Sequence, residues 1–104
     1  MWDLIWIQWV AIYLPDREFV AFFREAIAAL KPVPHARVVL KENVLKSDAD
    51  PPVPDLDDSS VTRSDAHLRR LWAEAGVTVH SAERQTGMPE ELYPIIMYVL
   101  GPAE

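Results

Sequence analysis

The sequence predicts an α/β fold in which parallel strands come first and an antiparallel pair closes the sheet. Short apolar runs typical of buried strands alternate with two amphipathic helical segments along the 104 residues. The last two strand-like segments follow one another with no helix between them. Half of the residues are apolar, which is enough for one buried core.

The first strand is predicted from the apolar run at residues 4–7, which continues at residues 9–13. Runs of this kind are typical of a central parallel strand that is covered on both faces. A signal peptide begins with basic residues, but this chain has Asp3 there. A membrane span needs about 20 apolar residues, and Gln8 and the polar residues 15–18 interrupt the run too early. We therefore expect a buried strand.

A helix and a second strand follow. Pro15 is suited to a first helical turn, and apolar residues recur at helical spacing, at Phe19, Phe23, Ile27 and Leu30. Residues 31–32 end this helix. The second strand covers residues 36–40 and ends in the polar residues 41–43.

Residues 47–60 hold five aspartates and three prolines, which predicts a loop that is able to bind a ligand. Ser64 is a candidate N-cap and Gly76 a candidate C-terminal stop for a second helix. We expect His67 on the exposed side of that helix. Two strands, at residues 77–80 and 92–100, complete the chain, and Pro94 suggests an edge or a bulge in the second of them.

The composition excludes several classes of function. Sixteen acidic and ten basic residues leave a net charge of -6, which argues against nucleic-acid binding and suits a cationic substrate. There is no cysteine, and the three histidines lack the spacing of a zinc site, so we expect no metal. We expect no membrane partner, and a cytoplasmic and/or nuclear location.

Four motifs carry a resemblance to a known family: DLIWIQWV at residues 3–10, KEN at 41–43, DLDDSSV at 55–61 and ERQ at 83–85. In this order and at nearly this spacing they are similar to the eukaryotic α-N-terminal protein methyltransferases. The variant AIY at residues 11–13 resembles trypanosomatid members more than animal ones.

The resemblance implies a fold and an activity. The fold is the carboxyl-terminal half of a class I, Rossmann-like S-adenosylmethionine (SAM) methyltransferase, with helices on the faces of the sheet. Residues 1–104 then form a single partial domain that lacks the amino-terminal SAM-binding half. All three glycines lie late in the chain, and none forms a SAM-binding turn. The implied reaction is methylation, by SAM, of the α-amino group of proteins that begin X-Pro-Lys or X-Pro-Arg.

The resemblance assigns three residues to catalysis. Asp58 matches the family's proton-accepting carboxylate, and Asn43 matches a residue that contacts the substrate amino end. The family's helper histidine falls on Tyr13, and a tyrosine is a poor base at neutral pH. Asp58 would then have to carry more of the deprotonation of the substrate amine. Without the resemblance, Asp58 is a solvated loop aspartate and Asn43 a strand-end residue that caps a turn.

Five further residues are assigned to binding. Gln8 is expected on the SAM side and Trp9 against the proline at substrate position two. Asp55 and Ser60 match an acidic pocket for the basic residue at position three, and Tyr93 lines the peptide channel. The alternatives are a buried amide, a core tryptophan, solvated loop residues and a half-buried strand tyrosine.

Two other functions stay open. One is a non-catalytic interaction module, or pseudo-methyltransferase, that pairs with a partner or with its own copy through the apolar strand at residues 4–10. The other is a methyltransferase for a different substrate, such as a small amine.

Overall fold

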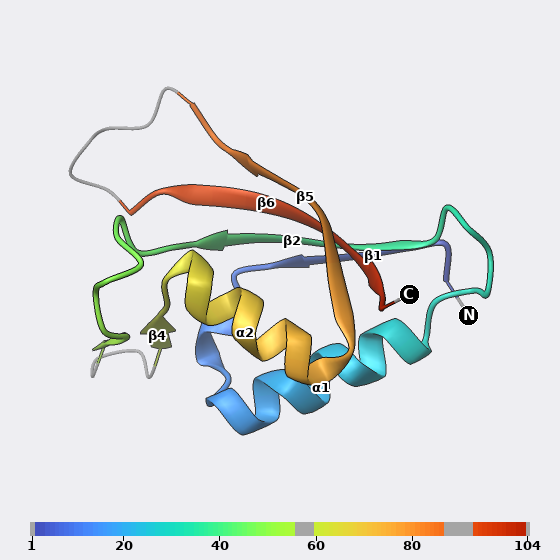
Figure 1. The fold of residues 1–104 in the computed structure, drawn as a ribbon, viewed down its shortest axis with the longest axis horizontal. Helices are drawn as coiled ribbons and strands as arrows, with labels where there is room; N and C mark the ends of the chain where they lie inside the picture. Colours follow the sequence, from blue (N-terminus) through green and yellow to red (C-terminus); the bar gives the residue numbers. More distant parts are fainter. Residues whose placement is uncertain (1, 56–59, 87–92, 104) are drawn as a thin grey trace.

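The computed structural model describes residues 2–55, 60–86 and 93–103. Its main feature is a four-stranded sheet in the order β1-β2-β6-β5 (Figure 1). The strands are β1 (Leu4–Gln8), β2 (Arg37–Asn43), β5 (Val77–Arg84) and β6 (Ile95–Pro102). β1 and β2 are parallel, whereas β6 runs antiparallel to both β2 and β5. The predicted succession of parallel strands and a closing antiparallel pair is thus confirmed.

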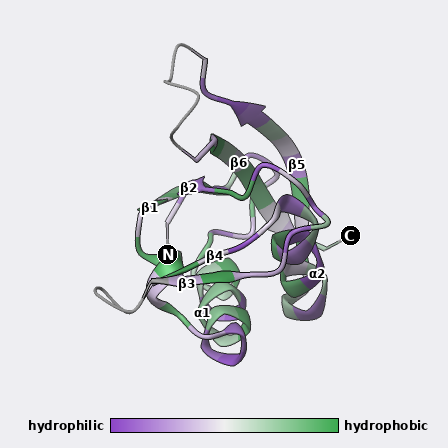
Figure 2. Cartoon of the chain, turned by 90° about the vertical axis from the view of Figure 1, so that its left-hand side faces the viewer, coloured by the Kyte–Doolittle hydropathy of each residue, from purple (hydrophilic) through white to green (hydrophobic). Residues whose placement is uncertain are grey.

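The helices α1 (Asp16–Ala28) and α2 (Asp65–Ala75) lie side by side on the same face of the sheet (Figures 1 and 2). An aromatic cluster fills the space between helices and sheet. It consists of fully buried rings whose centroids lie 4.6–5.9 Å apart, from Phe19, Phe23, Trp72 and Tyr98. Val38 and Leu40 of β2 are completely buried beneath the same cluster.

Both predicted caps of α2 are confirmed. The Ser64 hydroxyl accepts a hydrogen bond from the His67 amide at 3.1 Å, and Gly76 ends the helix at φ 75°. The prediction that His67 is exposed was wrong. Its ring is buried because Asp16, at the start of α1, provides a partner 3.0 Å from its Nε2 atom.

The expectation of a first strand covered on both faces was wrong, whereas an edge strand within residues 4–10 is confirmed. β1 ends at Gln8, and the apolar run continues as a 3₁₀ helix, η1 (Ala11–Tyr13). The chain turns at Trp9, and Ala11 then packs into the core instead of pairing with a strand. Among the described residues β1 is an edge strand, and its Leu4 and Trp6 side chains are exposed.

The predicted loop contains a small hairpin of β3 (Val53–Asp55) and β4 (Ser60–Thr62), seen in front of the sheet in Figure 2. β6 lies inside the sheet, so the edge position suggested by Pro94 was wrong. Pro94 immediately precedes β6, a position at which the sheet does not need a backbone N–H donor. In the β5–β6 pair the register shifts within β5, between Val79 and Ser81.

Candidate functional site

The candidate site lies where the parallel strands β1 and β2 end, here called the carboxyl edge. Gln8 is paired with Lys41 in the sheet, and Asn43 is the last residue of β2. Three further segments join them there. η1 follows β1, β4 packs against η1, and the start of β6 pairs with Asn43. The edge thereby gathers six of the predicted site residues, namely Gln8, Trp9, Tyr13, Asn43, Ser60 and Tyr93.

Three aromatic side chains of this edge are open to solvent. The exposed fractions are 44% for Trp9, 49% for Tyr13 and 41% for Tyr93. The alternative of a core tryptophan at position 9 is therefore wrong. Gln8 is exposed as well, and its Oε1 accepts a hydrogen bond from the indole of Trp6 at 3.2 Å. The carboxyl edge presents amphipathic ring surfaces that are able to pack on a ligand.

The remaining predicted residues differ in their surroundings. Asn43 is half-buried and Ser60 is buried. Asp55 closes β3 opposite Ser60. Asp58 lies outside the described residues. The catalytic and binding roles of all these residues remain predictions.

Trp9 adopts an unusual backbone conformation, with φ at 53°. A bulky side chain in this left-handed region costs about 1–2 kcal/mol, because its Cβ approaches the carbonyl oxygen. Its amide donates a 3.4 Å hydrogen bond to the Lys41 carbonyl. Strain of this kind persists where the surrounding structure imposes it, and it gathers at functional sites.

Glu42 is a buried carboxyl that the sequence reasoning did not single out. It is 1% exposed, and its Oε1 accepts a 3.1 Å hydrogen bond from the Asn43 amide. Oε2 has no partner among the residues that the structure describes. Burial raises the pKa of Glu42 to about 7, although the amides of Asn43 and Ile12 and the charge of Arg63 act to lower it. In the sequence, Glu42 stands out only as a charged residue on the same side of β2 as the apolar residues Val38 and Leu40.

Arg63 is the second buried charged residue, directly after β4. Its Nε donates to Asp16 Oδ1 at 2.9 Å, and its guanidinium lies 5.0 Å from the Phe19 ring centre. Partial burial raises the pKa of Asp16, but the hydrogen bonds with His67 and Arg63 outweigh this and leave it below its ordinary value. Asp16 is therefore ionised at neutral pH and balances the buried guanidinium.

A shallow hollow of about 410 Å³ opens beside the candidate site. It is lined by Lys41 near the end of β2, by Met97 near the start of β6, and by residues of the motif at 83–85 at the end of β5. Three charged residues line this hollow, the basic Lys41 and Arg84 and the acidic Glu83. It extends the carboxyl edge towards the β5–β6 hairpin.

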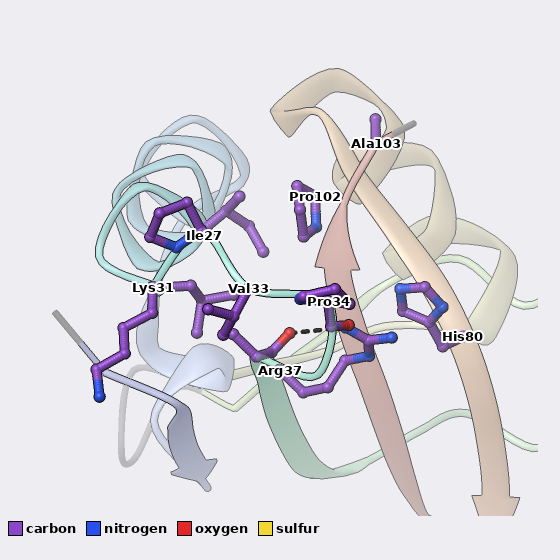
Figure 3. A pocket seen from close by; sticks show the side chains of 11 residues that line it. Ile27, Lys31, Val33, Pro34, Arg37, His80, Pro102 and Ala103 are labelled. Atoms are coloured by element: carbon purple, nitrogen blue, oxygen red, sulfur yellow. Dashed lines mark hydrogen bonds between the residues drawn. The ribbon is translucent and has the colours of Figure 1, made fainter.

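A second hollow, of about 450 Å³, lies at the opposite end of the sheet (Figure 3). Its cationic side chains already have partners. Arg37 Nη1 donates to the carbonyls of Pro34 and Ala36 at 2.7 and 2.8 Å, and Lys31 Nζ lies 3.2 Å from an Asp3 oxygen. This hollow therefore holds no concentration of unsatisfied groups that would select a ligand.

The described part of the chain contains no group of three or more residues suited to hold a metal ion. No helix within residues 2–55, 60–86 and 93–103 is both long and apolar enough to cross a membrane.

The chain matches the family model described as AdoMet dependent proline di-methyltransferase over residues 1–101. It is 41% identical over 99 residues to alpha N-terminal protein methyltransferase 1 of Oryza sativa subsp. indica, a match over 95% of this chain and 31% of that protein. It is 39% identical over 94 residues to N-terminal Xaa-Pro-Lys N-methyltransferase 1 of Danio rerio, over 90% of this chain and 40% of that one.

A similar solved structure is a SAM-dependent methyltransferase of Leishmania major. The TM-score is 0.87 at 44% identity, over 96% of this chain and 38% of that one. The mitomycin 7-O-methyltransferase MmcR, at 18% identity and a TM-score of 0.71, shares the fold alone. The likeness supports the predicted partial class I methyltransferase fold. The chain spans about a third of the length of the curated relatives from rice.

Proposed function

Because this chain belongs to the AdoMet-dependent proline di-methyltransferase family, we propose that its carboxyl edge forms the substrate side of an N-terminal protein methyltransferase. The substrates would be proteins that begin Xaa-Pro-Lys or Xaa-Pro-Arg, and the methyl donor would be SAM. One observation carries the proposal. The exposed residues Trp9, Tyr13 and Tyr93 lie on the segments that follow β1 or precede β6, and Asn43 ends β2, so all four belong to the carboxyl edge, where open α/β sheets bind their ligands.

The chemistry requires an uncharged amine. An α-ammonium group has a pKa of about 8, so it must lose a proton before its lone pair attacks a methyl group. We assign proton uptake to Asp58, with the side chain of Asn43 holding the amine in line. Tyr13 contributes a hydrogen bond rather than a base, because a tyrosine is a poor base at neutral pH.

Recognition of the peptide follows from the same edge. The Trp9 indole provides a flat apolar surface for the proline ring at position two. Asp55 and Ser60, paired in the β3–β4 hairpin, are assigned to the lysine or arginine at position three. Tyr93 lines the path of the peptide beyond these positions.

SAM supplies the methyl group when it is bound. The described residues fit only one flank of it, at Gln8. Gly76 and Gly101 lie at the opposite end of the sheet, so neither provides a glycine turn at the carboxyl edge. We propose that residues outside the described ranges complete the SAM site.

A second candidate function is favoured by the exposed apolar side chains of β1. Leu4 and Trp6 are more than half exposed on an edge strand, and such edges promote pairing with other strands. A non-catalytic module that associates with its own copy through residues 4–10 would form a folded oligomer that does not bind SAM.

Calorimetric titration with SAM, followed by a methyl-transfer assay, separates these functions. For the protein in which the SAM site is complete, we expect heat of binding and methylation of an Xaa-Pro-Lys peptide, with no methylation of the same peptide after amino-terminal acetylation. The 104-residue chain alone should bind SAM weakly. Asp58→Asn should abolish transfer, whereas Asp50→Asn, an exposed aspartate of the same loop, should not. If the protein with the complete SAM site is a folded oligomer that gives neither heat nor transfer, the enzyme is refuted and the interaction module is supported.

A further inference from the structure

One buried side chain joins the segments that carry the candidate site. We infer that Arg63 is a positioning residue, which fixes η1 against the ends of β2 and β4 and so sets where Trp9 and Tyr13 face the substrate. The structural part of this inference stands on contacts within the chain, and its consequence for catalysis rests on the proposed function.

The backbone of Arg63 ties β4 to the end of β2. Its carbonyl accepts a 3.0 Å hydrogen bond from the Leu45 amide, and the residue forms a parallel bridge with Val44. Asn43 directly precedes this bridge, and Ser60 begins the strand that leads to Arg63. The backbone of Arg63 thus links the two strands that carry these proposed substrate contacts.

The side chain of Arg63 reaches the third segment, η1. Nη1 donates to the Ala11 carbonyl at 3.3 Å and Nη2 donates to the Leu14 carbonyl. These two carbonyls flank Tyr13 on the chain. A guanidinium offers five donors in a rigid planar arrangement, so two such bonds fix the orientation of the turn as well as its distance.

The charge of Arg63 is balanced inside the same cluster. Its side chain is 2% exposed and pairs with Asp16, whose other oxygen lies 3.0 Å from His67 Nε2. A buried guanidinium without such partners would be costly. The partners are 47–52 residues distant in sequence, so the cluster joins η1, α1 and α2 around one residue.

The constrained segment includes the strained backbone of Trp9. A left-handed tryptophan needs neighbours that impose its conformation. Arg63 holds the residues after it, and the Glu42 carboxyl interacts with the Ile12 amide from the β2 side. We expect residues 9–14 to relax when the contacts of Arg63 are lost, which would move both aromatic rings.

Hydrogen exchange of the 104-residue chain, measured by NMR, tests the structural part. In Arg63→Met the amides of Tyr13 and Leu14, which close the η1 turn, should exchange about tenfold faster or more. The amides of Leu71 and Trp72 in α2 should change less. Arg69→Met is the matched control, because the Arg69 side chain is 46% exposed and pairs with Asp65, one turn earlier on α2.

Milder variants keep the test decisive if Arg63→Met does not fold. Arg63→Lys retains the charge without the planar arrangement of donors, and Asp16→Asn removes only the charged partner. Both should accelerate exchange at Tyr13 and Leu14 by a smaller factor. Unchanged rates at these two amides, or a rise no greater than that in α2, would overturn the inference.

A kinetic comparison tests the consequence for catalysis. Arg63→Lys should lower kcat for the peptide about tenfold while the KM for SAM stays unchanged, since a displaced amine affects the in-line attack. Equal kcat in the variant and the wild type would refute the positioning role. This comparison uses the protein in which the SAM site is complete. If that wild type transfers no methyl group, the proposed function fails, and the exchange rates alone decide whether Arg63 fixes η1.

Discussion

The two ends of the sheet use the same kinds of residue in different ways. Each end contains a residue with positive φ, which is glycine at the far end (Gly76) and tryptophan at the carboxyl edge (Trp9). Each end also contains an arginine that binds backbone carbonyls. Arg37 binds carbonyls one and three residues away and stays partly exposed, whereas Arg63 is buried and binds carbonyls 49 and 52 residues away.

We interpret the far end as structural and the carboxyl edge as the functional end. A glycine at a left-handed position and an arginine paired with nearby carbonyls cost little free energy. A strained tryptophan and a desolvated charge cluster cost free energy, and they are tolerated where they fix a functional geometry. Variants at the two ends of the sheet test whether their free-energy costs differ in this way.

The largest effect is expected from the two arginines. Arg63→Met should lower the free energy of unfolding by about 2–4 kcal/mol, because it leaves buried carbonyls without their donor and Asp16 without its cation. Arg37→Met should cost about 1 kcal/mol or less, since its bonds are local and partly solvated. Urea unfolding followed by circular dichroism measures both. Equal losses would remove the contrast.

The next effect is a pH dependence that originates at Glu42. Its folded-state pKa of about 7 lies above the ordinary 4.5, so the folded chain retains a proton that the unfolded chain has already lost between these values. Stability should therefore fall by about 1–3 kcal/mol as pH rises from 5 to 8. Urea unfolding of Glu42→Gln should lack this fall. The control Glu83→Gln, at an exposed position of β5, should retain it.

The strain at Trp9 is isolated by comparing two truncations. Trp9→Gly and Trp9→Ala remove nearly the same side chain, but only alanine keeps the Cβ that opposes φ 53°. The glycine variant should be more stable than the alanine variant by about 1 kcal/mol, the reverse of the usual order. Thermal unfolding of the pair measures the difference. A more stable alanine variant would mean that position 9 is not strained.

The smallest effect is expected at Gly76. A Cβ added there meets no atom within 4 Å, so Gly76→Ala is opposed by its φ of 75° alone. We expect a loss of about 0.5–1 kcal/mol in the free energy of unfolding. Peptide binding at the carboxyl edge should not change, which fluorescence titration would check. A change in peptide affinity would connect the two ends.

Local patterns in the sequence were sufficient for much of the fold. Helical spacing located both helices, and Ser64 and Gly76 marked the ends of α2 because caps are local signals. The turn after β1 was not predictable, since residues 9–13 have a typical strand composition and only packing selects η1. His67, Arg63 and Glu42 were misjudged or missed because their burial depends on contacts distant in sequence, such as Asp16 and Ile12.

The most direct test of the central claim is NMR titration of the labelled chain with an Xaa-Pro-Lys peptide in the presence of SAM. If the carboxyl edge binds the peptide, the signals of Trp9, Tyr13, Asn43 and Tyr93 should shift, and the amino-acetylated peptide should shift them much less. Shifts confined to Lys31, Arg37 and His80 at the opposite end, or no shifts at all, would contradict the claim.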